Sequence, residues 1–311
     1  MPIVRVVLSL VVLLAIGTAE SRSRSLRVPL TPFEVPPGRD RNPCEYLELP
    51  NPTAMDVRRF EVRAPRTRLH HILLYAYLGD ERDPQHVTHG LRDGEGCAAI
   101  GPPDMAGHTV GLLGAVRAGV YALPEGYAVS LRPRQPVAVH MHAFNATREP
   151  RRAVVRVKLV AAAPGEVRHH LEPMDVVNDA FELPPQARTV HAADFVAPFP
   201  MHVAMLSSHQ HRFGTRVTVH PIIDGVEQPP LYENARWREP PLTWLDPPLR
   251  LAPGDRLRVR CEWHNRSDTT LRFGPSANDE MCNLNGYFFR DAEVPPEART
   301  GIGGFLVPVT E

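Results

Sequence analysis

The stretch "PVAVHMHAF", residues 136–144, alternates the larger apolar side chains Val137, Val139 and Met141 with other residues, and it follows the turn signal "PRQP". Such alternation over a short run is typical of a half-buried β-strand. Comparable runs recur along the chain, among them "LHHILLYAYL" (69–78), "AVVRVKLVAAA" (153–163), "RVTVHPII" (216–223) and "RLRVRCEW" (256–263). No segment longer than about ten residues keeps a helical period, so the sequence predicts an all-β protein made of β-sandwiches.

The runs fall into two groups. Between them lies "APGEVRHH", residues 163–170, which has the composition of a hinge. A chain of 311 residues suits two medium domains, and we expect one β domain over residues 54–165 and a second over 166–311. Residues 20–53 are polar and rich in proline, which predicts an extended lead-in rather than a helix.

The N-terminus has the pattern of a secretory signal peptide. Arg5 precedes the apolar run Val6–Ile16, and three small residues end it at positions 17–19. We predict a signal peptide over residues 1–19 and an exported protein, secreted or periplasmic. The apolar run is too short to cross a bilayer comfortably, so no membrane span is expected.

The charged residues give no sign of a polyanionic partner. Thirty-five basic residues balance 35 acidic ones, and they are scattered along the chain. Neither nucleic acid nor an anionic membrane surface is therefore an expected partner. Only one basic residue, Lys158, is a lysine, and this bias together with 34 prolines is typical of a GC-rich bacterial genome.

The four cysteines form an even set in a chain expected to be exported. This favours two disulfides over free thiols, and it leaves three pairings open. They are Cys44, Cys97, Cys261 and Cys282.

Histidines stand at spacings that suit metal binding. In "SSHQHRFG", residues 207–214, His209 and His211 would leave the same face of a strand, close enough to chelate one ion. Taken alone, such a pair is more often two exposed side chains. The adjacent pair His70 and His71 would point to opposite faces of a regular strand, so joint ligation needs a bend or binding through Nδ1. "HMH" at 140–142 repeats the first spacing.

"NDEMCNLNGYFF", residues 278–289, places Met281 next to Cys282 and just before an apolar strand. A methionine in this setting is usually core packing. A thioether is also a soft ligand, and two imidazoles with one thioether suit Cu(I) while leaving a coordination position open.

These motifs occur together in a recognisable order: "HH" (His70, His71), "HMHAFN" (His142), "SSHQHRFG" (His209, His211) and "DEMCN" (Met281). The set resembles the copper type II, ascorbate-dependent monooxygenases, which include peptidylglycine α-hydroxylating monooxygenase and dopamine β-hydroxylase. The resemblance runs from about Cys44 onward and indicates a bacterial member. It implies two tandem antiparallel jelly-roll-like β-sandwich domains, each presenting one copper to the space between them.

The resemblance also assigns the metal ligands. It implies an electron-transfer copper on His70, His71 and His142, where His142 is preferred to His140 because Asn145 follows it at the family's spacing. The role of His140 stays open. It implies a second, catalytic copper on His209, His211 and Met281. Two coppers per chain would then use O2, ascorbate or another one-electron donor, and a small-molecule substrate.

The resemblance further implies the disulfides Cys44–Cys97 and Cys261–Cys282, the second of which would hold Met281. In the substrate pocket this chain departs from the family. Peptide-hydroxylating members have an arginine at the position of Ser207 and a tyrosine at that of Asn285, so a glycine-extended peptide is not an expected substrate. The catecholamine enzyme has an aromatic residue at Asn285, so a phenylethylamine is not supported either. Asn283 matches the family's polar residue and is expected to line the pocket.

Two other classes of function fit parts of the pattern. An exported copper carrier could keep all six ligands without oxygenase activity, and it would take up copper without consuming O2. A β-sandwich interaction module would bind no copper at all.

Overall fold

The structure is a computed structural model that describes residues 24–65, 68–77, 90–92, 110–116, 118–238, 240–274, 278–291 and 301–309. Every regular element in these residues is a β-strand, which confirms the predicted all-β class. The side chains of His70, His71 and residues 110–116 lie outside the description, as do the predicted signal peptide and Cys97.

The strands that precede the predicted hinge are β1 Ser25–Val28, β2 Phe33–Val35, β3 Asp40–Arg41, β4 Cys44–Glu48, β5 Met55–Arg63, β6 Arg68–Tyr77, β7 Gly90–Arg92, β8 Val110–Val116, β9 Gly119–Ala122, β10 Tyr127–Leu131, β11 Pro136–Phe144, β12 Arg151–Ala153 and β13 Arg156–Ala161. Those that follow it are β14 His169–Val177, β15 Glu182–Leu183, β16 Ala187–Val196, β17 Met201–His209, β18 Gly214–Ile223, β19 Val226–Glu227, β20 Tyr232–Asn234, β21 Thr243–Leu251, β22 Arg256–Asn265, β23 Leu271–Arg272, β24 Asn283–Arg290, β25 Ile302–Phe305 and β26 Val307–Pro308.

The predicted lead-in is extended, but it does not stand apart from the rest of the chain. β1 pairs with β13, β2 with β12, and β3 and β4 with β11. Side chains such as Phe33, Val35 and Leu47 are buried in the first core. Polar, proline-rich composition did not indicate this, because single apolar residues at alternate positions are enough to fill one face of a short strand.

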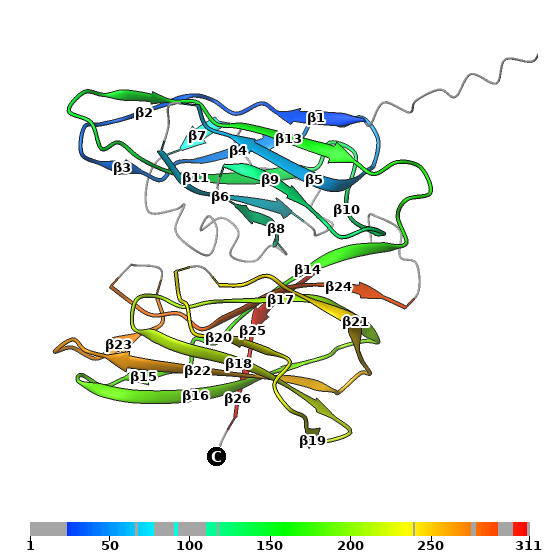
Figure 1. Ribbon diagram of the computed structural model, residues 1–311, viewed down its shortest axis with the longest axis vertical. Helices are drawn as coiled ribbons and strands as arrows, with labels where there is room; N and C mark the ends of the chain where they lie inside the picture. The colour runs from blue at the N-terminus through cyan, green and yellow to red at the C-terminus, as the bar shows by residue number, and fades with distance from the viewer. Residues whose placement is uncertain are drawn as a thin grey trace, which may run out of the picture.

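Two sandwiches share one continuous sheet (Figure 1). A ten-stranded sheet runs β1-β13-β5-β10-β14-β24-β17-β21, with β9 paired to β5 and β25 paired to β14, and the parallel pair β10–β14 joins its two halves. The first half is covered by the six-stranded sheet of β11 and its neighbours, and the second half by the six-stranded sheet of β18, β22 and β16.

The apolar residues form two cores. The first collects buried side chains from β1 to β13, and the second collects those from β14 to β24 and Leu306. Five residues of the second half, Leu171, Ala204, Met205, Tyr287 and Phe289, belong to the first core. One face of β17 and β24 is therefore turned toward the first half of the molecule, and the other face toward the second core.

The two halves meet through specific strands. β8 of the first half lies against β14 of the second. On β6, Ile72, Leu74 and Ala76 are in the first core, so Tyr75 is on the opposite face, where the charge of Asp175 on β14 acts on it. The exposed sides of the β6–β11 sheet and the β14–β24–β17 sheet thus face one another.

The described part of the chain has no helix long and apolar enough to cross a membrane.

Candidate metal centre

His209 and His211 lie at the end of β17 rather than both within it. His209 is the last residue of the strand, and His211 begins a turn closed by the hydrogen bond from Gly214 N to the His211 carbonyl (3.0 Å). Between them Gln210 is buried and donates to the Glu262 carbonyl (3.1 Å). The two imidazoles consequently project from the same side, as the spacing predicts, with ring centroids 5.1 Å apart and planes at 85°. Nitrogens about 2.0–2.1 Å from a shared ion give centroids roughly 5–6 Å apart, so the spacing suits joint ligation.

The tautomer of His211 is set by the backbone. Its Nδ1 lies 2.9 Å from the carbonyl oxygen of Asp279. A carbonyl only accepts, so Nδ1 carries the proton and donates, and Nε2 keeps a lone pair for a metal. The neighbouring segment 278–281 is thereby held against the His-x-His turn.

His209 has a buried nitrogen without a hydrogen-bond partner among the described residues, namely Nε2. Burial first, and then the charge of His211, lowers the pKa of His209 to about 4. The ring is therefore neutral near pH 7, which is the form that binds metal ions. A buried imidazole nitrogen left unpaired is costly unless something binds it.

Met281 reaches this place through β24. In the register of β17 with β24, Asn283 lies directly opposite His209, and directly opposed residues share a face. The Asn283 side-chain nitrogen lies 3.8 Å from the sulfur of Met281, which is completely buried. The Asn283 side-chain oxygen has no partner among the described residues. The thioether is therefore beside the cross-strand partner of His209.

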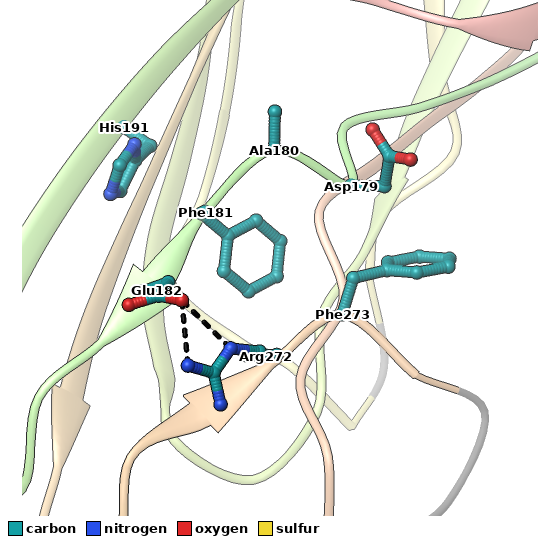
Figure 2. A pocket seen from close by; sticks show the side chains of 7 residues that line it. All are labelled: Asp179, Ala180, Phe181, Glu182, His191, Arg272 and Phe273. Carbon is teal, nitrogen blue, oxygen red and sulfur yellow. Dashed lines mark hydrogen bonds and ion pairs between the residues drawn. The ribbon is translucent and has the colours of Figure 1, made fainter.

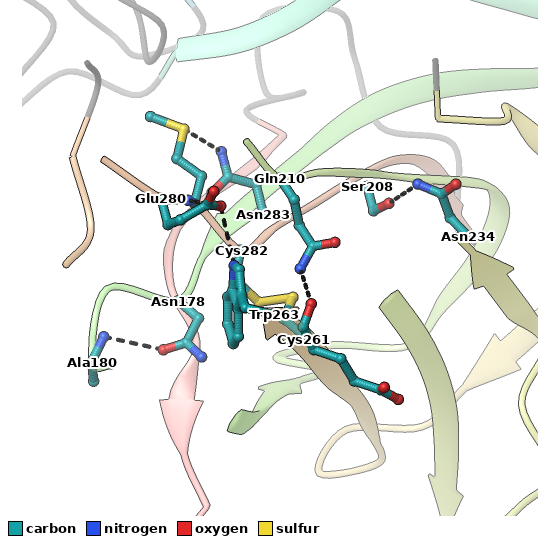
Figure 3. The surroundings of a disulfide bond; sticks show 12 residues. Asn178, Ala180, Ser208, Gln210, Asn234, Cys261, Trp263, Glu280, Cys282 and Asn283 are labelled. Atoms are coloured by element: carbon teal, nitrogen blue, oxygen red, sulfur yellow. Dashed lines mark hydrogen bonds between the residues drawn. A yellow bond between two sulfur atoms is a disulfide. The ribbon is translucent and has the colours of Figure 1, made fainter. Parts of the chain in front are cut away.

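Glu280 joins the two segments through hydrogen bonds, and it was not among the predicted site residues. Its carboxylate accepts from His211 N (3.0 Å), Phe213 N (2.7 Å) and the indole Nε1 of Trp263 (3.1 Å). Burial raises the pKa of Glu280, while these hydrogen bonds oppose the shift. Figure 3 shows Trp263 and Glu280 beside the Cys261–Cys282 disulfide. The predicted pairing of these two cysteines is confirmed.

The donors found here, two imidazole nitrogens and a thioether on a disulfide-braced turn, are those of a soft copper site. Residues 171–297 match the family described as copper type II ascorbate-dependent monooxygenase, C-terminal domain. The second half of the chain is thus similar to the C-terminal domain of this monooxygenase family. Such enzymes use copper and O2 to oxidise small-molecule substrates.

Other comparisons add nothing to this. No curated protein matches the chain. Solved structures of infectious bursal disease virus, of the Gt and Gx strains, align at 13% identity over 89% of this chain and 74% of theirs, with TM-scores of 0.18. At that TM-score the likeness carries no argument.

The strands of the first half place its predicted ligands near one another in the backbone. His71 lies directly opposite His142 in the pairing of β6 with β11, and the register then skips His70. This extra residue is a β-bulge, the kind of irregularity that the adjacent histidines require, because a bulge re-aims side chains. His140 instead faces Leu73. The register thus favours His142 over His140 as the companion of the adjacent pair.

The two histidines of β11 differ in their surroundings. His142 Nε2 lies 3.2 Å from the Asp40 carboxylate. His140 is 6% exposed, and burial, with the charge of His142, lowers its pKa to about 4.

Asp175 was also not among the predicted site residues. It stands on β14 directly opposite Asn285, which in turn stands opposite Ser207, so the three form one row across three strands. Asn285 donates to Asp175 (2.6 Å). An acid placed between the apolar residues Met174 and Val176 is the signal that could have found it.

A surface hollow of about 660 Å³ lies elsewhere in the second half of the chain (Figure 2). It is lined by Asp179, Ala180, Phe181, Glu182, His191, Arg272 and Phe273. Glu182 and Arg272 form an ion pair across it, and none of the predicted ligands lines it. Within the described residues, no group of three or more His, Cys, Asp or Glu side chains is placed to hold a metal. The His209 set has only two such side chains, with a thioether as its third donor.

Proposed function

We propose that the protein is an exported copper-dependent monooxygenase that hydroxylates an aliphatic C–H bond. The overall reaction takes the substrate, O2, two electrons and two protons to the alcohol and water. Ascorbate or another one-electron donor supplies the electrons. The catalytic copper belongs to His209, His211 and Met281, and the electron-transfer copper to His70, His71 and His142. Two domains divided near residue 165 would carry the two sites.

The observation that supports this most is the set of unused donors at the end of β17. His209 Nε2 is buried and has no hydrogen-bond partner in the described part of the chain, His211 Nε2 keeps a lone pair because Nδ1 donates to a carbonyl, and the Met281 sulfur lies beside Asn283. Copper bound there would supply O2 activation and one-electron chemistry. Three protein donors leave a position open for the oxidant.

Other groups of the chain would position the three donors and the substrate. Glu280 holds the His-x-His turn against residues 279–281, which keeps the three donors at a constant spacing. The Asp279 carbonyl prevents His211 from turning its Nδ1 toward the metal. Ser207, Asn283 and Asn285 continue the same face and would orient the substrate beside the open position.

The disulfides support the proposed export of the protein. Cys261 is bonded to Cys282, and Cys44 is also disulfide-bonded. Its predicted partner Cys97 lies outside the described residues. Disulfides persist in oxidising compartments, which supports the proposed signal peptide. The N-terminal sequence of the mature protein isolated from its host tests this, and we expect it to begin after Ala19.

Metal analysis and oxygen uptake test the proposal together. We expect two coppers per chain, a Cu–S contribution to the X-ray absorption of the reduced protein, and ascorbate-dependent O2 uptake that rises with a substrate C–H compound. Mass spectrometry should find one oxygen atom from 18O2 in the product. Copper uptake with no O2 consumption by any substrate would instead indicate a copper carrier. A chain that binds no copper would contradict both functions.

A further inference from the structure

The row Ser207–Asn285–Asp175 lies on the face of the sheet that carries the proposed catalytic ligands. On β17, Ser207 and His209 are two residues apart and therefore share a face. On β24, Asn285 and Asn283 do the same, and Asp175 extends the row onto β14. The opposite face of these strands holds Leu206, Leu284 and Val176 of the second core. Asp175 is thus turned toward the space between the two halves, as its effect on Tyr75 also indicates.

Asp175 is an acid with no paired cation among the residues that the structure describes. No arginine, lysine or histidine in the part of the chain that the structure describes forms an ion pair with it. Its Oδ1 accepts a hydrogen bond from the neutral amide of Asn285. Burial raises its pKa to about 6. Other acids of the same half, such as Asp194 and Glu172, are paired with arginines.

The distance between Asp175 and His209 sets the length of a ligand that could reach both residues. Two strand spacings and two residues separate it from His209, which gives roughly 12 Å between the Cα atoms. Asp175 and Asn285 both remain partly exposed, so a small molecule can reach them. A molecule of several bonds could contact Asp175 at one end while another carbon lies near His209.

We propose that Asp175, held by Asn285, is the specificity-determining residue of the active site and binds a positively charged group of the substrate, a protonated amine or guanidinium. This inference rests on the proposed function, because the bound cation is a substrate only if the protein is the proposed monooxygenase. A carboxylate that accepts from a cation forms a strong, charge-assisted hydrogen bond, and it repels an anionic ligand. The same charge excludes substrates that present a carboxylate to this row.

Calorimetric titration of the full-length, copper-free protein tests the proposal without activity as the readout. The probes are hexylamine, hexan-1-ol and hexanoate near pH 7.5, and copper is omitted so that the amine has no metal to bind. We expect hexylammonium to bind at least about tenfold more tightly than the other two. Asp175→Asn should remove this preference without changing the binding of hexanol, while Asp175→Glu should keep it. Asp268→Asn, which removes the same charge from an exposed turn, should have no effect.

The outcomes separate this inference from the proposed function, because the copper content of the same preparations is measured in parallel. Two coppers per chain with equal binding of the three probes, or with full amine preference in Asp175→Asn, would overturn the inference alone. An Asp175-dependent amine preference in a protein that binds no copper would uphold the cation site and overturn the monooxygenase. If Asp175→Asn does not fold, a preference for the amine in the wild type that Asp175→Glu retains still supports the site, and its absence overturns it.

Discussion

The backbone N–H of His211 donates to the carboxylate of Glu280 at 3.0 Å, although 69 residues separate them in the sequence. This contact joins the two motifs that carry the proposed catalytic ligands. It places the residue before Met281 against the turn that presents His211. The ligand set is therefore organised by a buried carboxylate as well as by the pairing of β17 with β24.

Replacing Met281 by isoleucine should remove one copper and leave the other. Isoleucine keeps the apolar volume but has no sulfur, so the soft site loses a donor while the first half is untouched. Metal analysis should find the content falling from two coppers to one, and X-ray absorption should lose the Cu–S contribution. Met55→Ile, an equally buried methionine of the first core, is the control and should keep both. Unchanged copper content in Met281→Ile would contradict the assignment.

Glu280→Gln should destabilise the protein and weaken copper binding at His209 and His211. A carboxylate accepts all the N–H groups around Glu280, whereas an amide offers one oxygen and presents an NH2 to the remaining donors. The expected loss is about 2–3 kcal/mol in the free energy of unfolding. Denaturant titration measures it. Glu182→Gln, which breaks the exposed pair with Arg272, should cost less than about 1 kcal/mol. Equal losses in the two variants would show that Glu280 has no special role.

Removing the disulfide with Cys261→Ala and Cys282→Ala should cost about 3 kcal/mol, as expected for a bridge that closes 21 residues. Because Cys282 follows Met281 directly, the copper affinity of the second site should fall more than that of the first. Denaturant titration and competition with a Cu(I) chelator measure the two effects. If the copper affinity of both sites falls equally in the double variant, the disulfide does not support the second metal site.

Asp175→Asn should stabilise the copper-free protein near neutral pH and leave it unchanged in acid. Burial raises the folded-state pKa of Asp175 from 3.8 to about 6, so the folded protein binds the proton more tightly than the unfolded chain. The stability linked to that proton is fully present below about pH 4 and is lost as the pH rises through about 6. A permanently neutral asparagine avoids the loss.

Melting curves of the two proteins at about pH 4 and pH 7.5 check this. The variant should melt a few degrees higher at pH 7.5 and at the same temperature at pH 4. Asp268→Asn should match the wild type at both. A wild type that melts higher than Asp175→Asn at pH 7.5 would reverse the sign and contradict the buried charge.

The sequence predicted a good part of the candidate site. His209, His211 and Met281 stand in short motifs, and the period of a strand already places the two histidines on one side. The pairing of Cys261 with Cys282 came from the family resemblance and is confirmed. What the motifs did not contain is Glu280's contact with the His-x-His turn, or Asp175, since both depend on which strand pairs with which and in what register.

The sequence by itself determined the all-β class, because alternation is a local property that each strand displays alone. It also determined which donor atoms the chain can offer a metal. Only the tertiary structure decided that one sheet runs through both halves, that a bulge falls at His70, and that Asp175 shares a face with His209. Strand pairing and register are set by the packing of side chains that are distant in sequence, so the sequence of a single strand does not specify which strands pair with it.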